Sequence, residues 1–234
     1  MATQALFFDV FGTLADWRSS IAREAQQILS PLGHDLDWLA FADAWRGEYQ
    51  PAMEEVRAGR TPFTKLDVLH RQNLDRILPR FGIKALPEDI ARRLNLAWHR
   101  LDCWPDVASG LARLKTRFRL APVSNGNISL MVDLARRNNL PWDAILGAEL
   151  VQTYKPAPEA YLRTLDILAM QPEEVCMVAA HNGDLAAARS CGLRTAFVPR
   201  PTEHGSGQTS DLRSVQDWDV VAADFGDLAY KLGA

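Results

Sequence analysis

The feature that most constrains this chain is an alternation of short apolar runs with amphipathic stretches, which fills its second half. Residues that favour β-structure dominate five runs, and helical spacing appears between the later ones in SLMVDLARRN, PEAYLRTLDILA and DLAAARSCG. The runs are ALFFDVF (5–11), RLAPVSN (119–125), AILGAEL (144–150), VCMVAA (175–180) and RTAFVP (194–199). Strands that are apolar at nearly every position and alternate with helices are typical of a parallel sheet covered on both faces. The sequence therefore predicts an α/β fold, a Rossmann-like parallel sheet sandwich.

Residues 16–98 have a different pattern, with no convincing strand and several amphipathic helices. Examples are SSIAREAQQILSPLG (19–33), DWLAFADAWRGEYQPAMEEVR (37–57) and EDIARRLNLAWHRL (88–101). Breaks between helices are expected at Gly33, Pro62, Gly82 and Pro87. We therefore expect a helical cap subdomain over 16–98, inserted after the first strand, and a Rossmann-like core over 1–15 and 99–234. The most loop-like segment is 199–211.

Charge and composition narrow the classes of partner. The net charge is -3, the pI is about 6.0 and no basic run stands out, which argues against nucleic acid or an anionic membrane surface as the partner. No secretory signal and no apolar run of membrane-spanning length is visible. Cys103, Cys176 and Cys191 match neither a zinc site nor a disulfide framework. A cytoplasmic location with reduced thiols is expected.

Polar side chains follow most of the predicted strands at the point where each strand ends. In open parallel sheets, such groups converge on one crevice beyond the carboxyl ends of the strands. The groups concerned are Asp9 to Thr13, Ser124 and Asn125, Lys155, and His181, Asn182 and Asp184. The sequence therefore predicts one site assembled from scattered segments.

Asp9 gives the strongest chemical signal. It ends an apolar strand and is soon followed by Gly12 and Thr13, so its carboxylate is expected among backbone amides where the chain turns. A carboxylate in such a place can attack carbon or phosphorus and form an ester intermediate. The simpler interpretation is that Asp9 caps a turn or pairs with Lys155.

Four segments, DVFGT, VSNG, YKPAPEAY and VAAHNGDLAAARSCG, resemble in order and spacing the four signatures of the haloacid dehalogenase-like hydrolase superfamily. DWRSS after the first signature, AWR at 44–46 and the VPRPTEHG loop are similar to its (S)-2-haloacid dehalogenase branch. The resemblance covers nearly the whole chain. It makes Asp9 the nucleophile.

Two positions depart from the phosphatases of this superfamily. Those enzymes carry a second aspartate two residues after the nucleophile, where this chain has Phe11, and a phenyl ring cannot donate a proton. They also carry an acidic pair in the fourth signature, where this chain has Ala180 and retains Asp184 alone. Two carboxylates make a thin site for Mg²⁺, which prefers octahedral oxygen ligands. Halide needs no proton to leave carbon, so dehalogenation accounts for both departures, and neither metal nor cofactor is expected.

The resemblance makes Arg46 a ligand for the departing halide or the substrate carboxylate. A guanidinium is permanently charged and weakly hydrated, which suits it to developing negative charge in a dry pocket. The alternative is a surface arginine paired with Glu48. Trp17 and Trp45 either pack in the core or form an apolar wall that limits substrate size.

Ser124 is expected to hold the substrate carboxylate and Asn125 to help hold the halide. Backbone amides of Val10 and Phe11 should assist. The alternative is a satisfied turn at the end of the strand.

Lys155 is expected beside Asp9, where its ammonium would keep the pKa of that carboxyl low. By resemblance, Tyr161 contacts the same polar network, although it could equally serve helix packing. Thr13 is expected to orient the Asp9 carboxylate by a hydrogen bond.

His181, Asn182 and Asp184 are interpreted as the hydrolytic half of the site. Water must attack the Asp9 ester, and a carboxylate with a nearby imidazole can position or deprotonate that water. Asp184 is the preferred base. Whether His181 takes part directly is left open, because well-known relatives have asparagine there and a lone histidine is more often structural.

The sequence thus predicts metal-independent hydrolysis of short 2-haloalkanoic acids to 2-hydroxy acids, through an Asp9 ester and with inversion at C2. Its small-molecule partners would be the haloacid and the halide, and the resemblance is compatible with a homodimer. The alternatives are a Mg²⁺-dependent phosphatase acting on a small phosphate ester and a non-catalytic binding protein that retains the fold.

Overall fold

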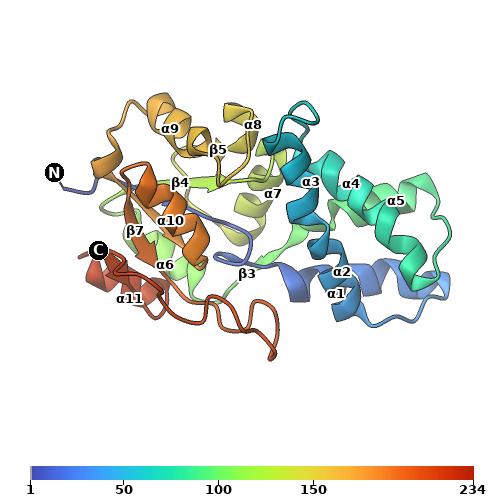
Figure 1. The fold of residues 1–234 in the computed structure, drawn as a ribbon. Coiled ribbons are helices and arrows are strands. Elements are labelled where there is room, and N and C mark those ends of the chain that lie inside the picture. Colours follow the sequence, from blue (N-terminus) through green and yellow to red (C-terminus); the bar gives the residue numbers. More distant parts are fainter. Residues whose placement is uncertain (1) are drawn as a thin grey trace.

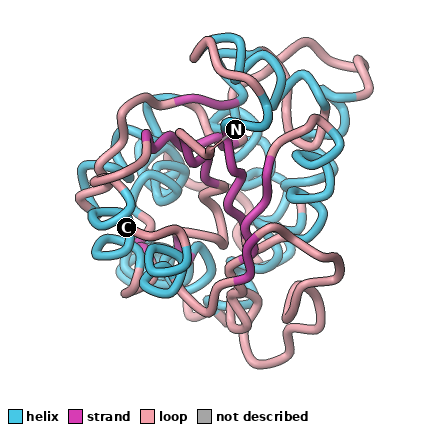
Figure 2. Tube along the Cα trace, turned by 90° about the vertical axis from the view of Figure 1, so that its left-hand side faces the viewer, coloured by secondary structure: helices cyan, strands magenta, loops and turns pink. Residues whose placement is uncertain are grey.

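The computed structural model describes residues 2–234 and contains a six-stranded sheet with the order β5-β4-β1-β6-β7-β8. Every neighbouring pair is parallel. Helices lie on both sides of the strands (Figures 1 and 2). The strands are β1 (Ala5–Phe8), β4 (Arg119–Ser124), β5 (Leu146–Gly147), β6 (Val175–Ala179), β7 (Arg194–Phe197) and β8 (Val220–Val221). The predicted α/β class with a parallel sheet is confirmed.

Both faces of this sheet are covered because its strands are apolar on both sides. In β1, Leu6 and Phe8 belong to one buried cluster, while Ala5 and Phe7 belong to the other. The first cluster includes side chains of α6 (Val107–Leu114), α7 (Ile128–Asn138) and α11 (Phe225–Lys231). The second includes side chains of α9 (Pro158–Ile167) and α10 (Asn182–Ser190). Successive side chains of a strand point to opposite faces, so one continuous apolar run fills both layers.

A helical segment lies beside the sheet and joins it through β2 (Ala15–Asp16) and β3 (Asp102–Cys103), which pair antiparallel (Figure 1). Its α-helices are α1 (Trp17–Leu29), α2 (Trp38–Gly47), α3 (Tyr49–Arg57), α4 (Leu66–Ile77) and α5 (Glu88–Asn95). Its 3-10 helices are η1 (Ser30–Leu32), η2 (Leu78–Phe81) and η3 (Leu96–Arg100). Asp16 and Asp37 begin α1 and α2, and each accepts a backbone N–H three residues on.

The strand predicted over 144–150 is much shorter in the structure. Only Leu146 and Gly147 pair with β4, and α8 (Ala148–Val151) follows at once. Gly147 has φ 135°, and a Cβ there would lie 2.2 Å from the carbonyl oxygen of Ser124. The chain can therefore cross the end of β4 only at a glycine, and the pairing stops.

The predicted single helix over 37–57 is also wrong. It breaks at Glu48, whose amide donates to the carbonyl of Trp45, three residues back instead of four. The break places Arg46 at the end of α2 and Tyr49 at the start of α3.

Two further differences concern short strands. The pattern missed β8, and Asp16 lies in β2 although no strand was expected over 16–98. The loop predicted over 199–211 contains neither helix nor strand. The structure adds a further 3-10 helix, η4 (Pro172–Glu174). Among residues 2–234, none of the helices is both long and apolar enough to cross a bilayer.

Candidate active site

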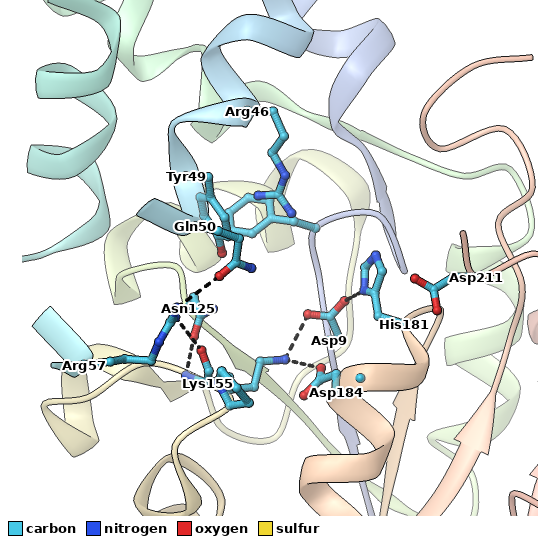
Figure 3. Close-up of a pocket in the computed structure, with 13 residues that line it drawn as sticks. Asp9, Arg46, Tyr49, Gln50, Arg57, Asn125, Lys155, His181, Asp184 and Asp211 are labelled. Atoms are coloured by element: carbon cyan, nitrogen blue, oxygen red, sulfur yellow. Dashed lines mark hydrogen bonds and ion pairs between the residues drawn. The ribbon is translucent and has the colours of Figure 1, made fainter. Parts of the chain in front are cut away.

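The candidate site lies beyond the carboxyl ends of three adjacent strands. Asp9 follows β1, Asn125 follows β4 and His181 follows β6, while Arg46 reaches the same place from α2 (Figure 3). Their side chains line a cavity of about 430 Å³. The lining residues are Asp9, Phe11, Arg46, Tyr49, Gln50, Arg57, Asn125, Lys155, Pro156, His181, Gly183, Asp184 and Asp211. The convergence predicted from the strand ends is therefore present.

Asp9 is held by three donors at the floor of this cavity. Its Oδ1 accepts from Nζ of Lys155 at 3.0 Å, and its Oδ2 accepts from Oγ1 of Thr13 at 2.7 Å. Nδ1 of His181 lies 3.1 Å from the same Oδ2. Burial alone would raise the pKa of Asp9, but the charges of Lys155 and His181 outweigh burial and hold that pKa far below its usual value. Asp9 is therefore an ionised carboxylate, and the hydrogen bond expected from Thr13 is present.

Lys155 also pairs with Asp184, at 2.5 Å from Nζ to Oδ2. The other oxygen of Asp184 accepts from the phenol of Tyr161, at 2.5 Å. Burial disfavours the charged lysine, but Asp184 and Asp9 together raise the pKa of Lys155. Tyr161 thus contacts the polar network without lining the cavity.

His181 lies between two carboxylates. Its Nε2 is 2.9 Å from Oε2 of Glu203, a residue of the 199–211 loop whose surface is 1% exposed. The indole Nε1 of Trp17 donates to the other oxygen of Glu203 at 2.9 Å. Burial lowers the pKa of His181, but the contacts with Asp9 and Glu203 raise it well above its usual value. His181 is therefore an imidazolium in direct contact with Asp9.

Arg46 lies among aromatic rings above the cavity. Its guanidinium carbon is 3.9 Å from the ring centre of Tyr49, 5.4 Å from that of Trp17 and 5.7 Å from that of Phe11. Its buried Nη1 has no hydrogen-bond partner among residues 2–234. It does not pair with Glu48, which binds Arg80 and Arg76 instead. A half-buried guanidinium with a buried, unused donor is suited to bind an anion.

Trp17 and Trp45 have different positions relative to the cavities. Trp17 lines a second cavity of about 480 Å³, which shares Arg46 and His181 with the first. Trp45 is fully buried and donates to the carbonyl of His70. Only Trp17 therefore forms part of a cavity wall.

The end of β4 contributes Asn125 but not the hydroxyl of Ser124. Oδ1 of Asn125 accepts from the amide of Lys155 at 2.8 Å, and its side chain lines the cavity. Ser124 is buried, lies outside the lining, and accepts from the amide of Gly126 at 3.0 Å. The hydroxyl of Ser124 therefore does not line this cavity, but it keeps its proton to donate, so its expected contact with the substrate carboxylate stays a prediction.

Backbone donors of the first loop remain available. The amides of Val10 and Phe11 donate to no acceptor within the described residues 2–234. Unpaired amides next to a carboxylate at a turn can bind an anion.

Asn182 is placed differently from the prediction. Its amide group donates to Asp211 and to the carbonyl of Arg213, and its oxygen accepts from Val215 and Trp218. All its polar atoms are used in tying the C-terminal loop to α10, so it cannot serve the hydrolytic step as expected.

Sequence reasoning missed seven residues of this region. Glu203 contacts His181, and the cavity is lined in addition by Tyr49, Gln50, Arg57, Pro156, Gly183 and Asp211. Arg57 donates to the carbonyl of Lys155 at 3.1 Å and so links α3 to the floor of the site. The only signal for Glu203 was the TEHG sequence of the loop.

Comparison with known proteins shows the family of this chain. Residues 3–192 match the family of haloacid dehalogenase-like hydrolases. The solved structure of the L-2-haloacid dehalogenase PA0810 is 47% identical, has a TM-score of 0.96, and is covered to 99% in both chains. That of the defluorinating L-2-haloacid dehalogenase Rha0230 is 45% identical with a TM-score of 0.97, over 99% of this chain and 96% of that one.

A curated relative extends the same picture. The (S)-2-haloacid dehalogenase 1 of Pseudomonas sp. (strain CBS-3) is 29% identical over 202 residues, which make up 84% of this chain and 85% of that protein. The family match covers most of the chain, and an ionised Asp9 lies at the edge of the sheet. Both observations point to the same family. The chain belongs to the haloacid dehalogenase-like hydrolases, and within them it resembles the 2-haloacid dehalogenases.

Proposed function

We propose that this enzyme hydrolyses short 2-haloalkanoic acids, with preference for the S form, to 2-hydroxy acids through an ester of Asp9. The observation that carries the proposal is that an ionised Asp9 and Arg46 line the same cavity, while Nη1 of Arg46 has no hydrogen-bond partner among residues 2–234. The first supplies a nucleophile and the second an anion site. The relatives named above as 2-haloacid dehalogenases support the same substrate class.

In the first step, an oxygen of Asp9 attacks C2 of the substrate from the side opposite the carbon–halogen bond. The new C–O bond forms as that bond breaks, so C2 is inverted and the halide takes the electron pair. Arg46 receives the halide, and the aromatic rings around it keep the charge out of water. The unpaired amides of Val10 and Phe11, with Asn125, would hold the substrate carboxylate and orient C2.

The helical segment would act as a cap over the cavity in which the reaction takes place. It supplies Arg46, Tyr49 and Arg57, so its position decides which substrates fit. We propose residues 16–98 for this cap, and the presence of α1 to α5 within this range supports the proposal.

The set of acidic side chains near Asp9 supports a reaction without metal. Among residues 2–234, no group of three or more His, Cys, Asp or Glu side chains could hold a metal ion, and Nζ of Lys155 bridges the carboxylates of Asp9 and Asp184. Phe11 and Ala180 also stand where the phosphatases have carboxylates. Lys155 supplies one positive charge to Asp9 and needs no exchangeable ion.

In the second step, water attacks the ester carbon of Asp9 and C2 keeps its new configuration. Asp184 is the base in this scheme, because its carboxylate lines the cavity and is fixed by Lys155 and Tyr161.

A single turnover in ¹⁸O water tests the scheme. With enzyme in excess over 2-chloropropionate, the label should enter the carboxylate of Asp9, while the product carries the unlabelled oxygen of the enzyme. Mass spectrometry of the Asp9 peptide and of the lactate measures both. Asp9→Asn serves as the control and should release no halide, and EDTA should change nothing. Label found directly in the product would refute the ester.

A further inference from the structure

The two oxygens of Asp9 have unequal surroundings. A carboxylate oxygen offers about two lone-pair sites to donors. Oδ2 is contacted by both Thr13 and His181, whereas Oδ1 is contacted by Lys155 alone among residues 2–234. Oδ1 therefore keeps a lone pair for attack, and Oδ2 is the oxygen that becomes the carbonyl of the ester.

His181 carries a proton on each ring nitrogen, as its neighbours require. Nδ1 faces Asp9 and Nε2 faces Glu203, and an ionised carboxylate can only accept. The pKa of Glu203 is lowered, since the contacts with His181 and Trp17 outweigh its burial. An imidazolium has no lone pair, so His181 in this position is a donor and not a base.

We propose that Thr13 and the His181 imidazolium form the oxyanion site for hydrolysis of the Asp9 ester, and that buried Glu203 positions and charges His181. This inference rests on the proposed function, because it requires the ester. It assigns Oδ2 a stabilised negative charge in the tetrahedral intermediate, and it leaves the base role to Asp184.

Hydrolysis of the Asp9 ester proceeds by addition of water and release of the product. Water adds to Cγ of the ester, one of its protons passes to Asp184, and the carbonyl electron pair moves onto Oδ2. When the C=O bond re-forms, the bond between Cγ and Oδ1 breaks, and Oδ1 leaves as the hydroxyl oxygen of the product. The proton on Asp184 passes to this oxygen, and the proton remaining on the new carboxyl of Asp9 goes to solvent.

The geometry needed for this step already exists in the resting site. Thr13 and His181 contact Oδ2 while it shares the carboxylate charge with Oδ1, lose that charge when the ester forms, and meet a full negative charge on Oδ2 in the tetrahedral intermediate. Donors held at 2.7 and 3.1 Å require no reorganisation when the charge returns. Glu203 cannot turn away, because Trp17 holds its other oxygen.

His181→Gln tests the donor by removing the positive charge. Ester formation should persist, because Asp9 loses a ground-state partner and Lys155 remains, while decay of the ester should slow by about 10²–10³-fold. Rapid quenching with 2-bromopropionate should then show one halide released per site in a burst, and intact-protein mass spectrometry should show the ester accumulating. His34→Gln is the matched control. His34 follows η1 in the helical segment and lines neither of the two cavities, so its replacement should leave both phases unchanged.

The pH dependence of ester decay separates a donor from a base. As a donor, His181 supports decay only while protonated, so the rate falls as pH rises past its pKa in the ester; a base would give the opposite trend. The charged groups around it are Asp9, Glu203, Arg46, Lys155, Asp184 and Asp211. Glu203→Gln keeps the shape but removes the counter-charge, so the falling limb should move to lower pH, and this test holds even if the His181 variant does not fold.

Three outcomes would overturn the oxyanion assignment. They are an ester that decays at the wild-type rate in His181→Gln, a decay rate that rises with pH through this limb, and a limb that does not move in Glu203→Gln. Absence of any ester or labelled Asp9 in the wild type would instead refute the proposed function itself.

Discussion

Replacing His70 with phenylalanine should make the stability of the protein less sensitive to acid. His70 is 1% exposed, and its ring stacks on Trp98 with the centroids 4.2 Å apart. Neither ring nitrogen has a hydrogen-bond partner in the part of the chain that the structure describes. Burial lowers the pKa of His70 from 6.5 to about 3, so the folded protein holds it neutral.

The size of the effect follows from that pKa. Below pH 6.5 the unfolded chain takes up a proton at His70 that the folded chain refuses until about pH 3. The free energy of unfolding therefore falls with decreasing pH, by about 1.4 kcal/mol per pH unit in this window. Between pH 6.5 and about pH 5 the loss due to His70 is about 2 kcal/mol. The raised pKa values of His99 and His181 act in the opposite direction, but both proteins retain those groups.

Urea unfolding of wild type and His70→Phe, measured at several pH values between 7 and 5, gives the difference directly. At pH 7 the variant should be nearly neutral, because two unpaired nitrogens are removed while a larger ring is packed. The advantage of the variant should then grow by about 2 kcal/mol as pH falls to 5. His70→Leu packs differently but also cannot titrate, so it must show the same trend. A stability difference that stays constant with pH in both variants would show that His70 is not held neutral.

Two further predictions concern the cavity and its support. Arg46→Met keeps an unbranched apolar stem but removes the guanidinium, so kcat/KM for halide release should fall by about 10²–10³-fold. The kcat/KM of Arg46→Lys should lie between those of wild type and Arg46→Met. A kcat/KM of Arg46→Met within a few-fold of wild type would exclude Arg46 as the halide ligand. Asn182→Ala leaves Val215 and Trp218 without their acceptor and should lower the free energy of unfolding by about 1–3 kcal/mol, with activity per folded molecule nearly unchanged. For Asn182→Ala, urea unfolding measures the free energy of unfolding and a halide-release assay measures the activity. An unchanged free energy of unfolding would contradict this prediction.

The strands were predictable where their burial is continuous. β1, β4, β6 and β7 lie within apolar runs because both of their faces pack against helices. The run over 144–150 gave the wrong length, since its pairing is limited by the close approach of Gly147 to Ser124, a contact between segments distant in sequence. The break at Glu48 was missed although the sequence signals it, because Gly47 directly precedes it and Pro51 follows three residues later.

The site was predictable where the topology of the sheet places it. Asp9, Asn125 and His181 meet because adjacent parallel strands end at one edge. Glu203 could not be predicted in the same way, since the path of an irregular loop brings it to His181. Asn182 was expected at the cavity because it closely follows the predicted strand 175–180, whereas its side chain turns to the C-terminal loop.

The low pKa of Asp9 raises a chemical question, because a weakly basic carboxylate is also a weaker nucleophile. The arrangement of charges gives the answer. In the proposed first step, attack on C2 would move one negative charge from Asp9 to the halide, and the cations Lys155 and Arg46 both line the same cavity, so its total charge would be unchanged. Stabilisation of the departing halide by Arg46 would then offset the weaker nucleophilicity of Asp9. The same low pKa favours the second step, since a stabilised carboxylate is the better product when the ester is cleaved. A site that holds its nucleophile this firmly is therefore suited to a leaving group that needs no proton.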